Sequence, residues 1–152
     1  MLMKKILQTV FKLRRQLIHS IAKDYIGKEA SPLDRVDDVV ACVESVTEIL
    51  KKAGAFPTIE TGTYTMYMKL ARSRHWVLVD NPEPGDIIIS PTGMSNKRTK
   101  MRGHIGITGV NNIIMSNDSY TGLWSATYSI KMWRDRYEKE GGYPVHFFRY
   151  IG

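Results

Sequence analysis

The stretch 102-RGHIGITGVNNIIMSN-117 carries the strongest structural signal in the chain. It divides into two short β-branched runs separated by the turn Gly109–Asn112, a pattern typical of an antiparallel hairpin. Successive side chains of a strand point to opposite sides, so His104, Gly106 and Thr108 share one face. Gly106 has no side chain, so it leaves space on that face beside His104. We therefore expect another element or a substrate to lie against the histidine.

The length of the turn sets the register of this hairpin. A two-residue or a four-residue loop places Ile107 opposite Ile114 and His104 opposite Asn117. The β-carbons of opposed residues lie about 4.5–5.5 Å apart, close enough for an amide to hydrogen-bond the imidazole and fix its tautomer. Asp118 would face the other way unless the loop were odd in length or the strand bulged. The sequence therefore predicts that Asn117 orients His104.

Cys42 is the single cysteine of the chain, and it falls near the start of a predicted helix, Asp38–Ala53, which Gly54 ends. A thiol near a helix N-terminus meets the positive end of the helix dipole, which favours the thiolate. A histidine on a neighbouring strand could accept the thiol proton. A lone cysteine is more often ordinary helix core, and so is a lone strand histidine. Together with Asn117, however, Cys42 and His104 point to a catalytic site.

The remaining pattern places helices first and a meander of strands after them, which predicts an α+β fold. An amphipathic helix is expected over residues 3–26, and Asp37 or Asp38 is expected to cap the helix of Cys42. The other expected elements are a helix at Thr63–Arg72 and strands at Trp76–Val79, Asp86–Ser90, Leu123–Ile130 and Val145–Ile151.

The length of 152 residues fits one domain, with an N-terminal helical part at 1–30 that belongs to the same compact unit and a main part at 31–152. Lysine and arginine outnumber acidic residues by 22 to 15, which suits a polyanionic partner. One cysteine allows neither an intrachain disulfide nor a cysteine-based zinc cluster. Paired-histidine spacing and glycine-rich phosphate loops are also absent from the sequence, so we expect no metal and no cofactor.

The N-terminal segment does not read as a membrane span or a signal peptide. A span needs about 20 apolar residues, and Gln8, Lys12 and Arg14 interrupt any apolar run here. The expected location is therefore the cytoplasm. The amphipathic helix could dock on a membrane or a cell wall, but a helix packed on the domain with a solvated basic face is the simpler interpretation.

Several segments between residues 34 and 130 together resemble the NlpC/P60 and CHAP families of papain-like amidases and endopeptidases. They are Ala41-Cys42-Val43-Glu44-Ser45-Val46, Asn81-Pro82-Glu83-Pro84-Gly85-Asp86-Ile87-Ile88, Gly103-His104-Ile105-Gly106-Ile107 and Ile114-Met115-Ser116-Asn117. The families' usual Asp-Cys-Ser-Gly sequence is replaced here by Ala-Cys-Val-Glu, which leaves the second oxyanion donor unassigned.

This resemblance implies a papain-like fold in which a nucleophile helix packs on an antiparallel sheet, with an additional N-terminal amphipathic helix. It implies that Cys42 is the nucleophile, His104 the general base and then acid, and Asn117 the orienting residue. The backbone N–H of Cys42 would supply one oxyanion donor. The implied reaction is hydrolysis of an amide in bacterial peptidoglycan through a thioester, by an amidase or an endopeptidase.

A small wall hydrolase without a signal peptide resembles a phage lysin, which a holin releases or a virion carries. Its basic surface would also suit anionic wall polymers. The alternative from another class is a non-catalytic basic protein that binds nucleic acid or an anionic membrane through the loop Lys97–Arg102 and the N-terminal helix. A solvated loop is the simpler interpretation of those charges, so nucleic acid is the less favoured partner.

Overall fold

The structure is a computed structural model that describes residues 1–32 and 38–152. The helices are α1 (Leu2–Tyr25), α2 (Asp38–Lys52), α3 (Thr63–Arg72) and α4 (Ile130–Trp133), with a short 3₁₀ turn η1 (Val110–Asn112) and a π-helical segment η2 (Arg134–Glu140). The strands are β1 (Trp76–Val79), β2 (Ile87–Ser90), β3 (His104–Thr108), β4 (Ile113–Asn117), β5 (Trp124–Ser129) and β6 (His146–Tyr150). The α+β class and the expected helices and strands are confirmed. The expected capping of α2 by Asp37 or Asp38 concerns side chains outside the described part of the chain.

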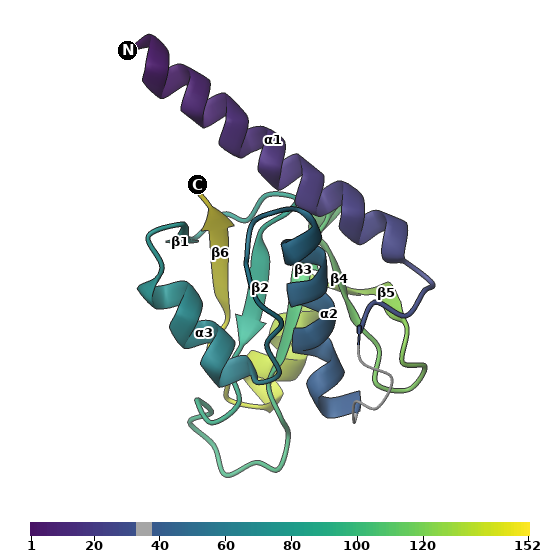
Figure 1. Cartoon of the computed structure of the whole chain (residues 1–152). Coiled ribbons are helices and arrows are strands. Elements are labelled where there is room, and N and C mark those ends of the chain that lie inside the picture. The colour runs from purple at the N-terminus through teal and green to yellow at the C-terminus, as the bar shows by residue number, and fades with distance from the viewer. Residues whose placement is uncertain (33–37) are drawn as a thin grey trace.

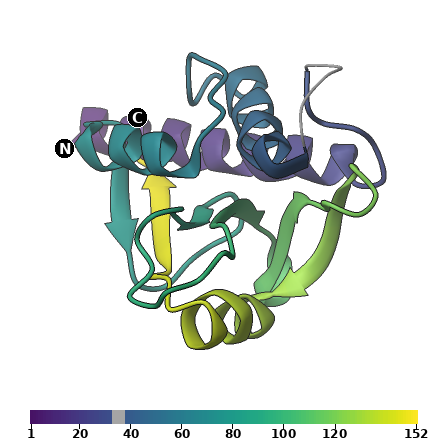
Figure 2. The same cartoon turned by 90° about the horizontal axis from the view of Figure 1, so that it is seen from below.

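The six strands form one antiparallel sheet in the order β1-β6-β2-β3-β4-β5. The helices α1, α2 and α3 lie on one side of it, and the helical segment formed by α4 and η2 lies on the other (Figures 1 and 2). Each face has its own core, because Ile105 and Ile107 of β3 pack with the first group of helices, whereas Ile88 packs with Trp133. The central strands β2 and β3 are therefore covered on both sides, as their apolar sequences require.

The helix α2 forms because its apolar residues recur on one stripe. Val43, Val46 and Leu50 are fully buried against the sheet. Gly54 ends the helix with a positive φ of 70°, and the N–H of Ala55 reaches back to the carbonyl of Leu50 at 2.8 Å. This fixes Cys42 near the beginning of a helix that packs against the domain from Ala41 to Leu50.

The helix α1 is joined to the domain through its C-terminal half. Ile18 and Ala22 are fully buried, and the Arg14 guanidinium donates to the carbonyls of Ala53 and Gly54 at 3.1 and 3.0 Å. These are orphan carbonyls at the C-terminal end of α2, where a cation also meets the helix dipole favourably. The N-terminal half of α1 extends beyond the sheet (Figure 1).

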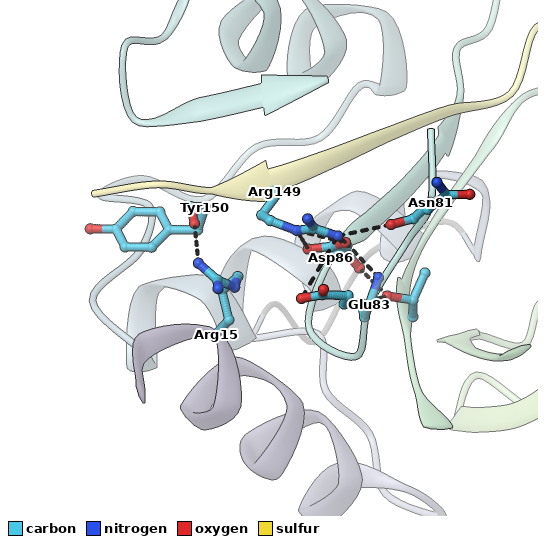
Figure 3. A network of polar contacts seen from close by, with 7 residues as sticks. Arg15, Asn81, Glu83, Asp86, Arg149 and Tyr150 are labelled. Carbon is cyan, nitrogen blue, oxygen red and sulfur yellow. Dashed lines mark hydrogen bonds and ion pairs between the residues drawn. The ribbon is translucent and has the colours of Figure 1, made fainter. Parts of the chain in front are cut away.

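Asp86, in the Pro-Gly-Asp turn before β2, is a structural residue. It is fully buried, accepts hydrogen bonds from the Arg149 guanidinium at 2.8–3.2 Å and accepts one from the N–H of Glu83 at 2.7 Å (Figure 3). Gly85 has a φ of 93°, and a Cβ there would lie 2.4 Å from the Arg15 carbonyl oxygen of α1. The turn thus holds β2, β6 and α1 together.

The predicted register of the β3–β4 hairpin is wrong by one residue. The structure pairs Ile107 with Met115 and Thr108 with Ile114, because the turn has three residues, those of η1. Asn111 and Asn112 have φ values of 54° and 60°, in the left-handed region that asparagine tolerates better than most residues. This odd-length turn brings Asp118, rather than Asn117, into line with His104.

In the described part of the chain, every helix is too short or too polar to cross a bilayer.

Candidate active site

Cys42 is the fifth residue of α2, and its side chain is only 3% exposed. Burial raises the pKa of the thiol to about 12, although the backbone N–H groups of Val43, Ile105 and Cys42 itself act in the opposite direction. The nearby Glu44 carboxylate raises that pKa further. Desolvation therefore opposes the thiolate that the helix N-terminus is expected to favour.

His104 begins β3 and is enclosed by aromatic rings. Its imidazole is stacked on Trp133 at 5.2 Å and on Tyr137 at 5.8 Å between ring centres, with interplanar angles of 19° and 23°. The Trp133 indole N–H donates to the Ser90 hydroxyl at 3.0 Å, and Ser90 is the residue paired with His104 in β2. These contacts hold the imidazole plane in one orientation.

A bulge brings a third ring to the histidine. The pairing of β4 with β5 shifts by one residue between Ile114 and Ser116. As a result Ala126 packs in the core on the α2 side, whereas Tyr128 packs in the core of Trp133 and lies 6.5 Å from His104. A bulge that redirects a side chain is common beside functional sites.

The pKa of His104 is lowered to about 4, mainly by burial and also by the Arg136 guanidinium. The Asp118 carboxylate acts in the opposite direction and raises the pKa of His104. Asp118 is therefore close enough to act on the imidazole through its charge. Its Oδ1 accepts a hydrogen bond from the N–H of Tyr120 at 2.7 Å, which fixes the carboxylate in the loop after β4.

Asn117 lies on the opposite face of β4 from Asp118. It shares its face with Met115, which packs in the core on the α2 side. The Asn117 side chain is 3% exposed, and within the described residues neither its amide nitrogen nor its amide oxygen has a hydrogen-bond partner. A buried unpaired amide costs about 1–3 kcal/mol, so Asn117 is an unusual residue to find in this position unless it has a ligand.

One cavity of about 560 Å³ brings these groups together. Its lining includes the three residues predicted as catalytic and the carboxylate that the corrected register adds, namely Cys42, His104, Asn117 and Asp118. The remaining lining residues are Met101, Arg102, Gly103, Ser116, Ser119, Tyr120, Thr127, Tyr128, Met132, Arg136 and Tyr137. Cys42 and His104 thus reach the same space from a helix and from a strand that follows it by about sixty residues.

The helical segment α4–η2, which carries Trp133, Arg136 and Tyr137, was not predicted from the sequence. Two signals for it are present. The Ser129 hydroxyl caps α4 by accepting from the N–H of Met132 at 3.1 Å, and Trp133 and Tyr137 are spaced by one helical turn. Burial is the main cause that raises the pKa of Tyr137, and the charge of Cys42 adds to it, so this ring lies near both the thiol and the imidazole.

The basic loop between β2 and β3 is partly bound to the domain. The Lys97 ammonium donates to the Lys139 carbonyl of η2, and the Tyr143 hydroxyl donates to the Met101 carbonyl. Arg102 lines the cavity. This loop therefore forms part of the rim of the site.

No family model matches this chain, and no curated protein matches it in sequence. Among solved structures, the chain is similar to one in the crystal structure of the type VI effector–immunity complex Tae3–Tai3 from Ralstonia pickettii, with a TM-score of 0.55 and 16% sequence identity. The similarity covers 88% of this chain and 96% of that one. At this identity it shows the fold alone. It agrees with the expected papain-like α+β architecture, in which the cysteine helix packs on an antiparallel sheet.

Proposed function

We propose that this protein is a cysteine hydrolase that cleaves an amide bond in bacterial peptidoglycan. The observation that carries the proposal is the cavity that Cys42 and His104 share. Two separate elements, α2 and β3, contribute Cys42 and His104 to the lining of one cavity. A cysteine with a histidine base beside it is the combination that nucleophilic catalysis needs. The resemblance of the cysteine and histidine segments to families that cleave peptidoglycan supports a substrate in the bacterial cell wall, and the similarity to one chain of a type VI effector–immunity complex supports the fold.

In the proposed reaction His104 accepts the Cys42 proton while the sulfur attacks the amide carbonyl carbon. The resulting tetrahedral intermediate collapses when the carbon–nitrogen bond breaks, and His104 passes its proton to the leaving nitrogen. Water then attacks the thioester with His104 again as the base, which releases the carboxylate and returns the thiol. The pKa values of about 12 and about 4 mean that thiol and imidazole are both neutral before substrate binds.

We further propose different roles for the two residues at the end of β4. Asp118 orients His104 and stabilises the imidazolium, the role that the uncorrected register gave to Asn117. Asn117 faces the α2 side and donates its amide N–H to the oxyanion, together with the backbone N–H of Cys42. This assigns the second oxyanion donor that the sequence left open, and it gives the buried amide a partner during the reaction.

Digestion of purified peptidoglycan, followed by mass spectrometry of the soluble fragments, tests the proposed function. We expect fragments in which one amide has gained water, leaving a new amine and a new carboxylate, with every sugar linkage intact. Fragments with new reducing ends would contradict an amide hydrolase. An inert protein that binds nucleic acid with a steep loss of affinity at high salt would instead establish the non-catalytic alternative.

A further inference from the structure

The N-terminal half of α1 presents an apolar stripe that the domain does not cover. Every residue from 1 to 10 is exposed, whereas Phe11 contacts Tyr150 and Ile18 is buried. The stripe consists of Met3, Ile6, Val10, Leu13 and Leu17, which recur at intervals of three and four residues and are 43–70% exposed. Phe11 and Ile18 mark the side of α1 that faces the domain, and the stripe lies on a different side.

The stripe continues into a shallow groove between α1 and the C-terminal end of α2. Val10, Leu13 and Leu17 form one wall of this groove, and Lys51 and Lys52 lie on the other. An occupant of this groove would therefore lie between an apolar surface and two basic residues, of which Lys52 is already paired with Glu48 and hydrogen-bonded to the Tyr25 hydroxyl.

The charged residues in the N-terminal part of α1 are all basic. Residues 1–17 contain Lys4, Lys5, Lys12, Arg14 and Arg15 and no aspartate or glutamate. The two arginines donate to backbone carbonyls of the domain. The described structure gives the three lysines no ion pair, and all three are exposed.

An occupant that matches these features must be apolar and negatively charged. A second copy of this chain would bring one basic helix against another, which repels. The stripe is also a convex ridge of aliphatic side chains without an exposed aromatic anchor, whereas protein partners commonly bind through buried aromatic residues. A ridge of this kind fits a deformable surface better than a rigid one.

We propose that the N-terminal half of α1 binds the surface of an anionic phospholipid bilayer. The apolar stripe inserts at the boundary between headgroups and acyl chains, while Lys4, Lys5 and Lys51 lie near anionic headgroups. The C-terminal half of α1, fixed by Ile18, holds the hydrolase domain beside the membrane. This inference rests on α1 and the adjoining end of α2, and it does not depend on the proposed hydrolysis.

Co-sedimentation with vesicles tests the proposal. The full chain is mixed with vesicles of phosphatidylcholine, and separately with vesicles of phosphatidylcholine and phosphatidylglycerol. We expect binding to the anionic vesicles only, and weaker binding as salt concentration rises. The double variant Ile6→Asn/Val10→Asn should bind at least about tenfold more weakly, because it removes apolar contact from the stripe.

The control is Leu78→Asn, since Leu78 is 52% exposed but lies on β1. It should bind as wild type does, and all three proteins should give the same circular dichroism spectrum because the substituted side chains are exposed. Absence of binding to anionic vesicles, or equal binding by the double variant, would overturn the proposal. A dimer in sedimentation velocity that the double variant dissociates would assign the stripe to a second copy and would also overturn it.

Discussion

The two faces of the sheet meet at the candidate site, and they differ in composition. On the α2 side, Ile105, Met115 and their helix partners belong to a larger core of mostly aliphatic side chains, with Trp76, Trp124 and Phe148 among them. On the other side, Trp133 and Tyr137 stack on His104, and Ile88 and Ile114 pack in the same cluster.

The proposed nucleophile comes from the α2 side and the proposed base from the side of Trp133. Desolvation acts on both in opposite directions, raising the pKa of Cys42 and lowering that of His104. Burial of both side chains therefore favours a neutral thiol and a neutral imidazole over a thiolate–imidazolium ion pair. Substrate must then supply part of the polar environment that the reaction needs.

The largest expected effect is that of Cys42→Ala. It should abolish turnover on peptidoglycan fragments, because the methyl group cannot attack a carbonyl, and should leave the melting temperature close to that of wild type, because little volume is lost. Cys42→Ser should be nearly as inactive, since a neutral site without a strong base does not activate an alcohol. Activity of Cys42→Ala within twofold of wild type would refute the cysteine mechanism.

Asn117→Ala tests the proposed oxyanion donor on the α2 side of the sheet. We expect kcat to fall by about 10²–10³, the usual cost of one oxyanion donor, while its pH dependence stays in place. The melting temperature should stay the same or rise, because the substitution removes a buried amide without a partner in the described structure. A large loss of stability with unchanged kcat would instead make Asn117 a structural residue.

Asp118→Asn tests the carboxylate proposed to orient His104 on the other side of the sheet. The carboxylate raises the pKa of His104, so its removal should lower that pKa by about one unit and shift the acid limb of kcat/KM to lower pH. Asparagine keeps an oxygen that can accept from the Tyr120 N–H, so the loop should survive. We expect kcat/KM at pH 7 to fall about tenfold through loss of the orienting charge. If the acid limb of kcat/KM lies at the same pH in Asp118→Asn as in the wild type, Asp118 does not act on His104.

A separate prediction concerns the dependence of the free energy of unfolding on pH. His104 has a folded pKa of about 4, below its ordinary value of 6.5, so its contribution to stability is present above pH 6.5 and is lost as pH falls toward 4. Urea unfolding of wild type should show this loss, and His104→Gln should show less of it. Equal slopes for the two proteins between pH 6.5 and 4 would mean that the imidazole is not desolvated.

The sequence predicted the parts of the site that depend on periodicity. The stripe Val43, Val46 and Leu50 defines α2, and the alternation around His104 defines β3. It missed the register of the hairpin, because the left-handed conformations of Asn111 and Asn112 depend on how the two strands pack. The proposed change of the orienting residue from Asn117 to Asp118 follows from that shift of one residue.

Two further features depend on tertiary structure. The aromatic enclosure of His104 brings residues of α4 and η2 to the start of β3, and the Trp133 N–H there donates to the Ser90 hydroxyl of β2. The raised pKa of Cys42 results from the burial of the start of α2 against β3, which spacing in the sequence does not reveal. The helices and strands can thus be predicted from local sequence patterns, whereas the pKa values of the site residues depend on the tertiary structure.

The most direct test of the central claim is the mass of the intact protein after an acid quench during turnover of a soluble peptidoglycan fragment. The account predicts an adduct with the mass of the acyl portion of the fragment, located on the peptide that contains Cys42 and released by hydroxylamine as a thioester is. In His104→Ala the adduct should form too slowly to accumulate. Product formation by the wild type together with full retention of activity in Cys42→Ala, and no adduct at any quench time, would contradict it.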